Sequence, residues 1–150
     1  MKKMYCRILA TLLCVLCLSG CGNVHTYMTY TYNVSTGDSV DIKLDTSDDY
    51  QLTSDLPFEI SKDGQLLTSG SFINADGYQM YAGAVEEDEN ASLLENGSTD
   101  TIEYFMWNYN NSEYNYAILI KNSQTGVLLG NTVSEESAKE VFNRLQISLN

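Results

Sequence analysis

The chain has 150 residues and a formal charge of −12 at pH 7, because 20 acidic residues outnumber 8 Lys and Arg. Such an acidic surface repels phosphate polymers, so we expect no nucleic-acid partner, whereas cationic partners or divalent cations are attracted. The simplest interpretation of the acidity is that it keeps the protein in solution.

The first twenty residues have the three zones of a secretory signal. The beginning is basic, residues 8–18 are apolar except Thr11, and Ser19-Gly20 supplies the small residues that precede a cleavage site. The apolar zone is too short for a spanning helix, which needs about 20 residues. We therefore predict a cleaved signal peptide over residues 1–20.

Cys21 directly follows this signal. The segment Leu18-Ser19-Gly20-Cys21 resembles the bacterial lipobox, and of the four cysteines only Cys21 has small residues before it. The resemblance implies a lipoprotein precursor in which the Cys21 sulfur takes a diacylglyceryl group and its amine is acylated, for example with palmitate. Membrane lipid is then the first partner. Two or more acyl chains on Cys21 would hold the protein stably at the extracytoplasmic face of the cell membrane.

Processing before Cys21 leaves five basic against 20 acidic residues, a formal charge of −15, and a single thiol. A disulfide and a Cys-based metal site are therefore excluded from the mature chain. We expect residues 21–26 to form the lipidated Cys and a short tether, and residues 27–150 to form a single domain. The only histidine, His25, falls on that tether, so zinc binding and Ser-His-Asp catalysis are not expected.

Alternation of apolar and polar residues predicts strands in the first half of the domain. In 39–44, for example, Val40, Ile42 and Leu44 share one face. Asp63-Gly64 lies between two apolar runs and predicts a two-residue hairpin turn. The predicted strands are 27–34, 39–44, 50–53, one that opens at Pro57, and 66–73.

A change to helical spacing predicts a helix over 74–85, with Asn74 or Asp76 as its cap. The acidic run 86–89 opposes the helix dipole, so we expect the helix to end there. Asn96-Gly97 is typical of a second hairpin turn. The remaining predicted elements are strands 92–95, 100–109, 114–121 and 127–129, and a final helix, 134–145, capped by Ser134.

The order of these elements is strands, helix, strands, helix, with hairpin-like connections between strands. This order predicts an α+β domain in which two helices, the second at the C-terminus, pack on an antiparallel sheet of about six to seven strands. It is loosely similar to the order in the Mog1/PsbP-like folds, a resemblance that covers element order alone. Likeness of fold alone implies no function.

Few residues are typical of catalysis or metal binding. The chain has no Gly-x-Ser-x-Gly elbow, no phosphate-binding loop and no dinucleotide motif, so we expect no cofactor. A carboxylate pair, Glu103 with Asp100, Glu113 or another acid, has the chemistry of glycoside hydrolysis. The acidic loop 45–49 has the chemistry of a loose calcium site. In both cases solvated surface acids are the simpler interpretation, and we predict no metal.

The segment 104–109 is strongly aromatic. As a strand it puts Trp107 and Tyr109 on one face, while Tyr114 and Tyr116 share one face of the returning strand. The functional hypothesis is that these four side chains form an aromatic platform that binds a sugar or a peptide. The alternative is that they pack in the core, where most large aromatic side chains lie.

Export, lipid anchoring and the scarcity of catalytic motifs favour a non-catalytic binding or interaction module at the cell envelope, with a protein or a glycan as partner. The alternative is a carboxylate-dependent envelope hydrolase acting on glycan or peptide. A solute-binding component of a transporter is a third class, although such receptors usually have two lobes and this chain is short for that. Acids that converge in one cleft would favour the enzyme, and an exposed aromatic groove would favour the binding module.

Overall fold

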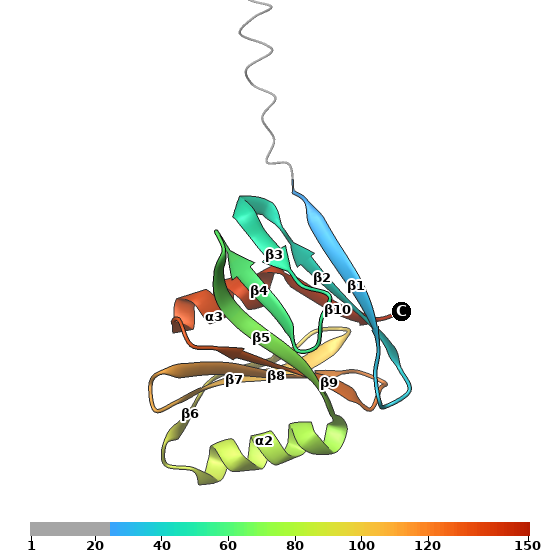
Figure 1. The fold of residues 1–150 in the computed structure, drawn as a ribbon. Coiled ribbons are helices and arrows are strands. Elements are labelled where there is room, and N and C mark those ends of the chain that lie inside the picture. Colours follow the sequence, from blue (N-terminus) through green and yellow to red (C-terminus); the bar gives the residue numbers. More distant parts are fainter. Residues whose placement is uncertain (1–24) are drawn as a thin grey trace, which may run out of the picture.

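A computed structural model describes residues 25–150 as two antiparallel sheets, two α-helices and one short 3-10 turn (Figure 1). The predicted signal peptide, residues 1–20, and the predicted lipidation site, Cys21, lie outside the described residues. Among the helices of residues 25–150, none is long and apolar enough to cross a membrane. The antiparallel sheets and the two helices confirm the predicted α+β class.

The larger sheet has seven strands in the order β3-β4-β5-β9-β8-β7-β6, as predicted in number, and every neighbouring pair is antiparallel. The predicted turn at Asp63-Gly64 joins β4 to β5, with φ angles of 51° and 78° that suit a tight hairpin. The strands are β3 (Tyr50–Leu52), β4 (Phe58–Lys62), β5 (Gln65–Asn74), β6 (Ala91–Ser98), β7 (Ile102–Tyr109), β8 (Glu113–Ile120) and β9 (Thr125–Asn131).

A smaller sheet has strand β2 (Ser39–Asp45) between β1 (Tyr27–Asn33) and β10 (Leu145–Leu149). The hairpin of β1 and β2 forms as predicted, and the inward residues of β2 are completely buried. The 3-10 turn η1 (Ser47–Asp49) then carries the chain from β2 to β3.

The predicted helix 134–145 forms near the C-terminus, and strand β10, which follows it, was not predicted. Helix α3 (Glu135–Arg144) lies near the end of the chain, but it stops at Arg144 and the chain continues as a strand. Ile147 of this strand is buried and lies opposite Ile42 of β2. The segment alternates apolar and polar residues, and pairing with a distant strand decides its conformation.

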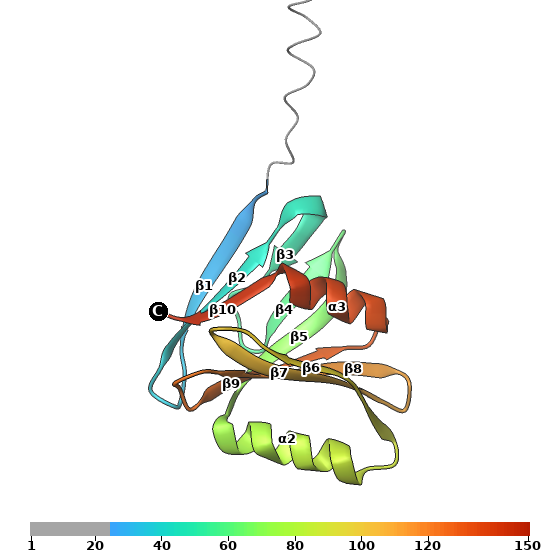
Figure 2. The same ribbon diagram turned by 180° about the vertical axis from the view of Figure 1, so that it is seen from behind.

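The helices cover opposite faces of the larger sheet. Helix α2 (Ala75–Glu87) lies on one face, and α3 lies on the other together with the smaller sheet (Figures 1 and 2). The main core fills the space on the α3 side, whereas a second cluster of Tyr78, Phe105, Trp107 and Ala117 packs beneath α2. The strands β7 and β8 are therefore covered on both faces, which agrees with the apolar residues on both of their faces.

Both helices begin at the predicted caps. The Asn74 side chain accepts a hydrogen bond from the Gly77 backbone N–H at 2.8 Å, and the Ser134 hydroxyl accepts one from the Ser137 N–H at 3.1 Å. Each cap satisfies one of the free N–H groups at a helix start. The cap at Asn74 therefore fixes the point where β5 ends and α2 begins.

The predicted hairpin turn at Asn96-Gly97 is wrong. Strand β6 continues through both residues, and the chain turns instead at 99–101, where the Thr99 hydroxyl accepts hydrogen bonds from two following N–H groups. Gly97 serves a different purpose, because a Cβ atom there would lie 2.5 Å from the hydroxyl oxygen of Tyr104. This glycine is needed for the close approach of an aromatic ring, and not for a positive φ angle.

Candidate functional site

An open groove of about 310 Å³ lies at the C-terminal end of α2, between the helix and the hairpin of β7 and β8. Its walls combine three aromatic rings with apolar, acidic and amide side chains, the composition that is typical of ligand sites. It is lined by Tyr81, Ala84, Val85, Asp88, Ala91, Trp107, Tyr109, Glu113, Asn115 and Leu128.

Helical spacing and strand alternation together build this groove. Tyr81 and Val85 are four residues apart and therefore share the face of α2 that contacts the sheet, and Asp88 directly follows the last residue of the helix. On β7, alternation turns Trp107 and Tyr109 toward the same space. The rings of Tyr81 and Trp107 are 5.8 Å apart between centroids, so the helix closes over the tryptophan and leaves the end of the groove open.

The structure brings together two of the four residues proposed for ligand binding. Trp107 is 6% exposed and forms the floor of the groove, whereas Tyr109 is 36% exposed at its edge. Trp107 lies opposite Asn115 in the β7–β8 register, which puts Asn115 on the groove side of β8. The neighbouring residues Tyr114 and Tyr116 therefore lie on the other face of the sheet.

Tyr116 is part of the main core. It is 1% exposed, its ring stacks on Phe142 at 4.3 Å between centroids, and its hydroxyl donates to Glu95 Oε1 at 2.9 Å. Burial and the adjacent Glu95 raise the pKa of the Tyr116 phenol. Tyr114 packs against the same core, and its hydroxyl donates to the Asn111 backbone oxygen at 3.4 Å. These two tyrosines are thus separated from the groove by the sheet.

Sequence reasoning missed Tyr81, Asp88 and Asn115 as groove residues. Tyr81 lies on α2 and Asp88 is the residue that follows the helix, and only the packing of α2 shows which strands these two side chains meet. The sequence did not show which residues of β8 lie on the same face of the sheet as Trp107. The three-residue turn between β7 and β8 sets their register and puts Asn115 on that face.

Two carboxylates line the groove, and Glu103, the acid on which the predicted catalytic pair depends, is not one of them. Glu103 and Glu113 lie at opposite ends of the β7–β8 hairpin, because Glu113 pairs with Tyr109, six residues or about 20 Å along β7. The second groove acid is Asp88, whose Oδ1 accepts hydrogen bonds from the backbone and side-chain nitrogens of Asn90 at 2.9 and 3.0 Å.

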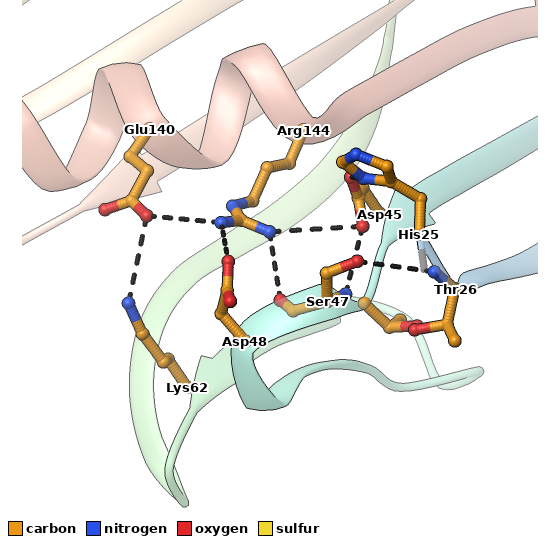
Figure 3. Close-up of polar contacts among 9 residues, drawn as sticks. His25, Thr26, Asp45, Ser47, Asp48, Lys62, Glu140 and Arg144 are labelled. Atoms are coloured by element: carbon orange, nitrogen blue, oxygen red, sulfur yellow. Dashed lines mark hydrogen bonds and ion pairs between the residues drawn. The ribbon is translucent and has the colours of Figure 1, made fainter. Parts of the chain in front are cut away.

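A second polar region surrounds Arg144 at the end of α3, as Figure 3 shows. Its guanidinium donates to the Ser47 backbone oxygen at 2.9 Å and to Asp48 Oδ2 at 2.7 Å, and it lies 3.6 Å from Glu140. The same group lies 4.1 Å from the centroid of the Tyr50 ring. One side chain therefore joins η1, β3 and α3.

The beginning of the described chain is attached to this region. His25 Nδ1 lies 2.7 Å from Asp45 Oδ2, and the Thr26 backbone N–H donates to the Ser47 hydroxyl at 3.3 Å. Hydrogen bonds from the Ser47 hydroxyl and N–H, together with His25, lower the pKa of Asp45 to about 2. His25 and Thr26, which we expected on a free tether, thus contact the domain (Figure 3).

The acidic loop 45–49 has the same partners. Asp45 is bound to His25 and Asp48 to Arg144, so both carboxylates already have side-chain partners in the protein. Within residues 25–150, no three His, Cys, Asp or Glu side chains lie close enough together to hold a metal ion. The loop therefore serves to connect the N-terminal strand, η1 and α3.

Comparisons of this chain with protein-family models, with curated proteins and with solved structures found no match. The resemblance of its element order to the Mog1/PsbP-like folds stays a prediction, and its function has to be argued from the geometry of its own residues.

Proposed function

We propose that the protein is an exported lipoprotein, held at the extracytoplasmic face of the cell membrane through acylated Cys21, and that it acts as a non-catalytic binding or interaction module. The ligand site is the groove at the end of α2. One observation carries the proposal: Tyr81, Trp107 and Tyr109 line an open groove together with carboxylate and amide groups. Aromatic faces with a few polar groups bind ligands without any catalytic residue.

The position of the groove fits an anchored binding module. Helix α2 lies at the end of the domain opposite His25, where the described chain begins (Figures 1 and 2). From Cys21 to His25 the extended chain reaches at most about 14 Å. A lipid on Cys21 would therefore hold the His25 end near the bilayer and present the groove toward the envelope space, within reach of envelope proteins or glycans.

The alternative function is the carboxylate-dependent hydrolase, and one observation favours it: Asp88 and Glu113 line the same groove. A carboxyl group that acts as a general acid needs apolar surroundings that keep it protonated. Glu113 is exposed, and Asp88 is bound to Asn90 in a local turn. Both acids are therefore better suited to attracting a ligand than to transferring a proton.

The test of the site uses Trp107, which is the only tryptophan in the chain. We would purify the full-length protein from membranes, add envelope glycan fragments and peptides, and record tryptophan emission. A true ligand should shift the emission and lose at least tenfold in affinity for Tyr109→Ala. The matched control is Tyr27→Ala, because Tyr27 is also exposed but lies at the other end of the domain.

Two outcomes would contradict the proposal. If both tyrosine variants lose affinity equally, the groove is not the site. If a ligand is cleaved and the double variant Asp88→Asn, Glu113→Gln abolishes cleavage, the protein is a hydrolase.

The anchor has its own test. Cys21→Ala should move the protein from the membrane fraction to the soluble fraction, because a domain with 15 excess negative charges has no attraction to anionic lipid. Unchanged membrane association in this variant would remove the lipoprotein part of the proposal.

A further inference from the structure

Negative charge is concentrated around the groove. Residues 75–113, which form α2, β6, β7 and their connections, contain nine acidic residues and no Lys or Arg. None of the residues that line the groove is basic. Within the described part of the chain, neither Asp88 nor Glu113 takes part in an ion pair. The groove thus offers carboxylates and aromatic faces without a cation.

The other end of the domain shows what this chemistry binds. There Arg144 lies 4.1 Å and Lys62 4.9 Å from the centroid of the Tyr50 ring, and Glu140 is within ion-pair distance of both cations. A cation above an aromatic face and beside a carboxylate is stabilised by both. The groove contains the same aromatic and acidic groups, but no basic side chain of residues 25–150 lines it.

The end of α2 shows that local stability does not explain these acids. Glu86 and Glu87 occupy its last turn, where no basic residue is present, and Asp88 and Glu89 follow. Negative charges at a helix C-terminus oppose the helix dipole and destabilise the helix. Departures from such local preferences tend to occur at functional sites.

We infer that the groove binds a Lys or Arg side chain from a basic segment of an envelope protein; this inference rests on the proposed function of the groove. The aliphatic stem of such a side chain packs against Trp107 and Val85, and its charged end reaches Asp88 and Glu113. The volume of about 310 Å³ is at the low end for ligand pockets and suits one or two long side chains. A second copy of this acidic chain has the wrong charge to be the partner.

The probe for this inference is a trilysine peptide, tested against the same peptide with acetylated side-chain amines. The full-length protein is held in neutral detergent, and emission of Trp107 reports occupancy of the groove. We expect acetylation to weaken binding at least tenfold, and Glu113→Gln and Asp88→Asn each to weaken trilysine binding three- to tenfold. The matched control is Glu59→Gln, an exposed acid on β4 outside the acidic segment, which should bind as the wild type does.

The outcomes separate this inference from the proposed function. Equal binding of both peptides, or equal loss in the Glu113 and Glu59 variants, would overturn the inference, because recognition would then not depend on charge at the groove. If an uncharged N-acetylglucosamine tetrasaccharide shifts the Trp107 emission and trilysine does not, the groove is a glycan site; the proposed function stands and the inference falls. If no fraction of a native envelope extract changes the emission either, the groove is not a site and both fall.

Discussion

The surroundings of Arg144 and the groove at α2 are built from similar groups and differ in one respect. Each combines tyrosine or tryptophan rings with carboxylates, on opposite sides of the larger sheet. Around Arg144 the protein supplies the cation, and that side chain is only 17% exposed. At the groove, none of the described lining residues is basic. Similar aromatic and carboxylate groups therefore hold elements of the fold together at one end of the domain and line an open groove at the other.

The presence of a cation at only one of the two ends agrees with different roles for them, stability at the Arg144 end and binding at the groove. The end near His25 would receive any force transmitted through a lipid anchor, and its contacts join the first described residues to η1, β3 and α3. The other end carries an edge strand, β6, and a helix, α2, that ends in acidic residues. Variants at the Arg144 end should therefore change stability, whereas most variants at the groove should change binding alone.

Trp107→Ala is the groove variant that breaks this rule and has the largest expected effect. Trp107 is buried beneath α2 against Tyr81 and Phe105, so its removal leaves a cavity and should lower the free energy of unfolding by about 3–5 kcal/mol. Urea unfolding followed by circular dichroism would measure this. Tyr109→Ala is the control at the rim and should lose less than about 1 kcal/mol. A loss near zero for Trp107→Ala would show that the packing beneath α2 is wrong.

Arg144→Ala should lower the free energy of unfolding by about 2 kcal/mol, because it removes charge-assisted hydrogen bonds to Ser47 and Asp48 in a half-buried position. Arg144→Lys should recover part of this loss, since one ammonium cannot reproduce both directions of the guanidinium. The control is Lys121, whose ammonium donates one exposed hydrogen bond to the Thr99 backbone oxygen. If Lys121→Ala lowers the free energy of unfolding as much as Arg144→Ala does, the Arg144 contacts stabilise the fold no more than an ordinary surface hydrogen bond.

Charge removal at the end of α2 should have the opposite sign. Glu87→Gln takes away a negative charge that opposes the helix dipole, and it should stabilise the protein by about 0.3–1 kcal/mol at low salt. The gain should shrink at high salt, because screening weakens exposed charges. Thermal unfolding at two salt concentrations would measure it. A destabilised variant would mean that Glu87 makes a favourable contact with the domain.

Local sequence signals predicted the elements that they control directly. Asp63-Gly64 adopts the positive φ angles of a hairpin turn, and the side chains of Asn74 and Ser134 cap their helices. Val40 and its alternating neighbours in β2 are buried as their pattern indicates. In each case the physical cause lies within a few residues of the signal.

Features that depend on distant contacts were not predictable in this way. Gly97 has the sequence of a turn, but the ring of Tyr104 on the next strand determines its role. Strand β10 depends on pairing with β2. The placement of Trp107 and Tyr116 on opposite faces of the sheet depends on the register of β7 and β8. The groove itself needs α2 in place, because its residues come from a helix and four strands.

The smallest expected effect concerns pH and Asp45. Its carboxyl has a pKa of about 2 in the folded protein, against about 3.9 in an unfolded chain, because the Ser47 hydroxyl and N–H and then His25 favour the charged form. Its contribution to stability is therefore complete above about pH 4 and is lost as the pH falls from about 4 to 2, where the unfolded chain takes up the proton first.

Asp45→Asn should remove this part of the pH dependence and leave the rest, since Asp38 and Asp41 also have a lowered pKa through hydrogen bonds from Ser123 and Thr31. The measurement is the difference in unfolding free energy between the variant and the wild type at several pH values from 5 to 2. The two proteins should converge toward the acid end of this range. A constant difference across it would show that Asp45 contributes through neutral hydrogen bonds alone, and the attachment of His25 at this end would then not depend on charge.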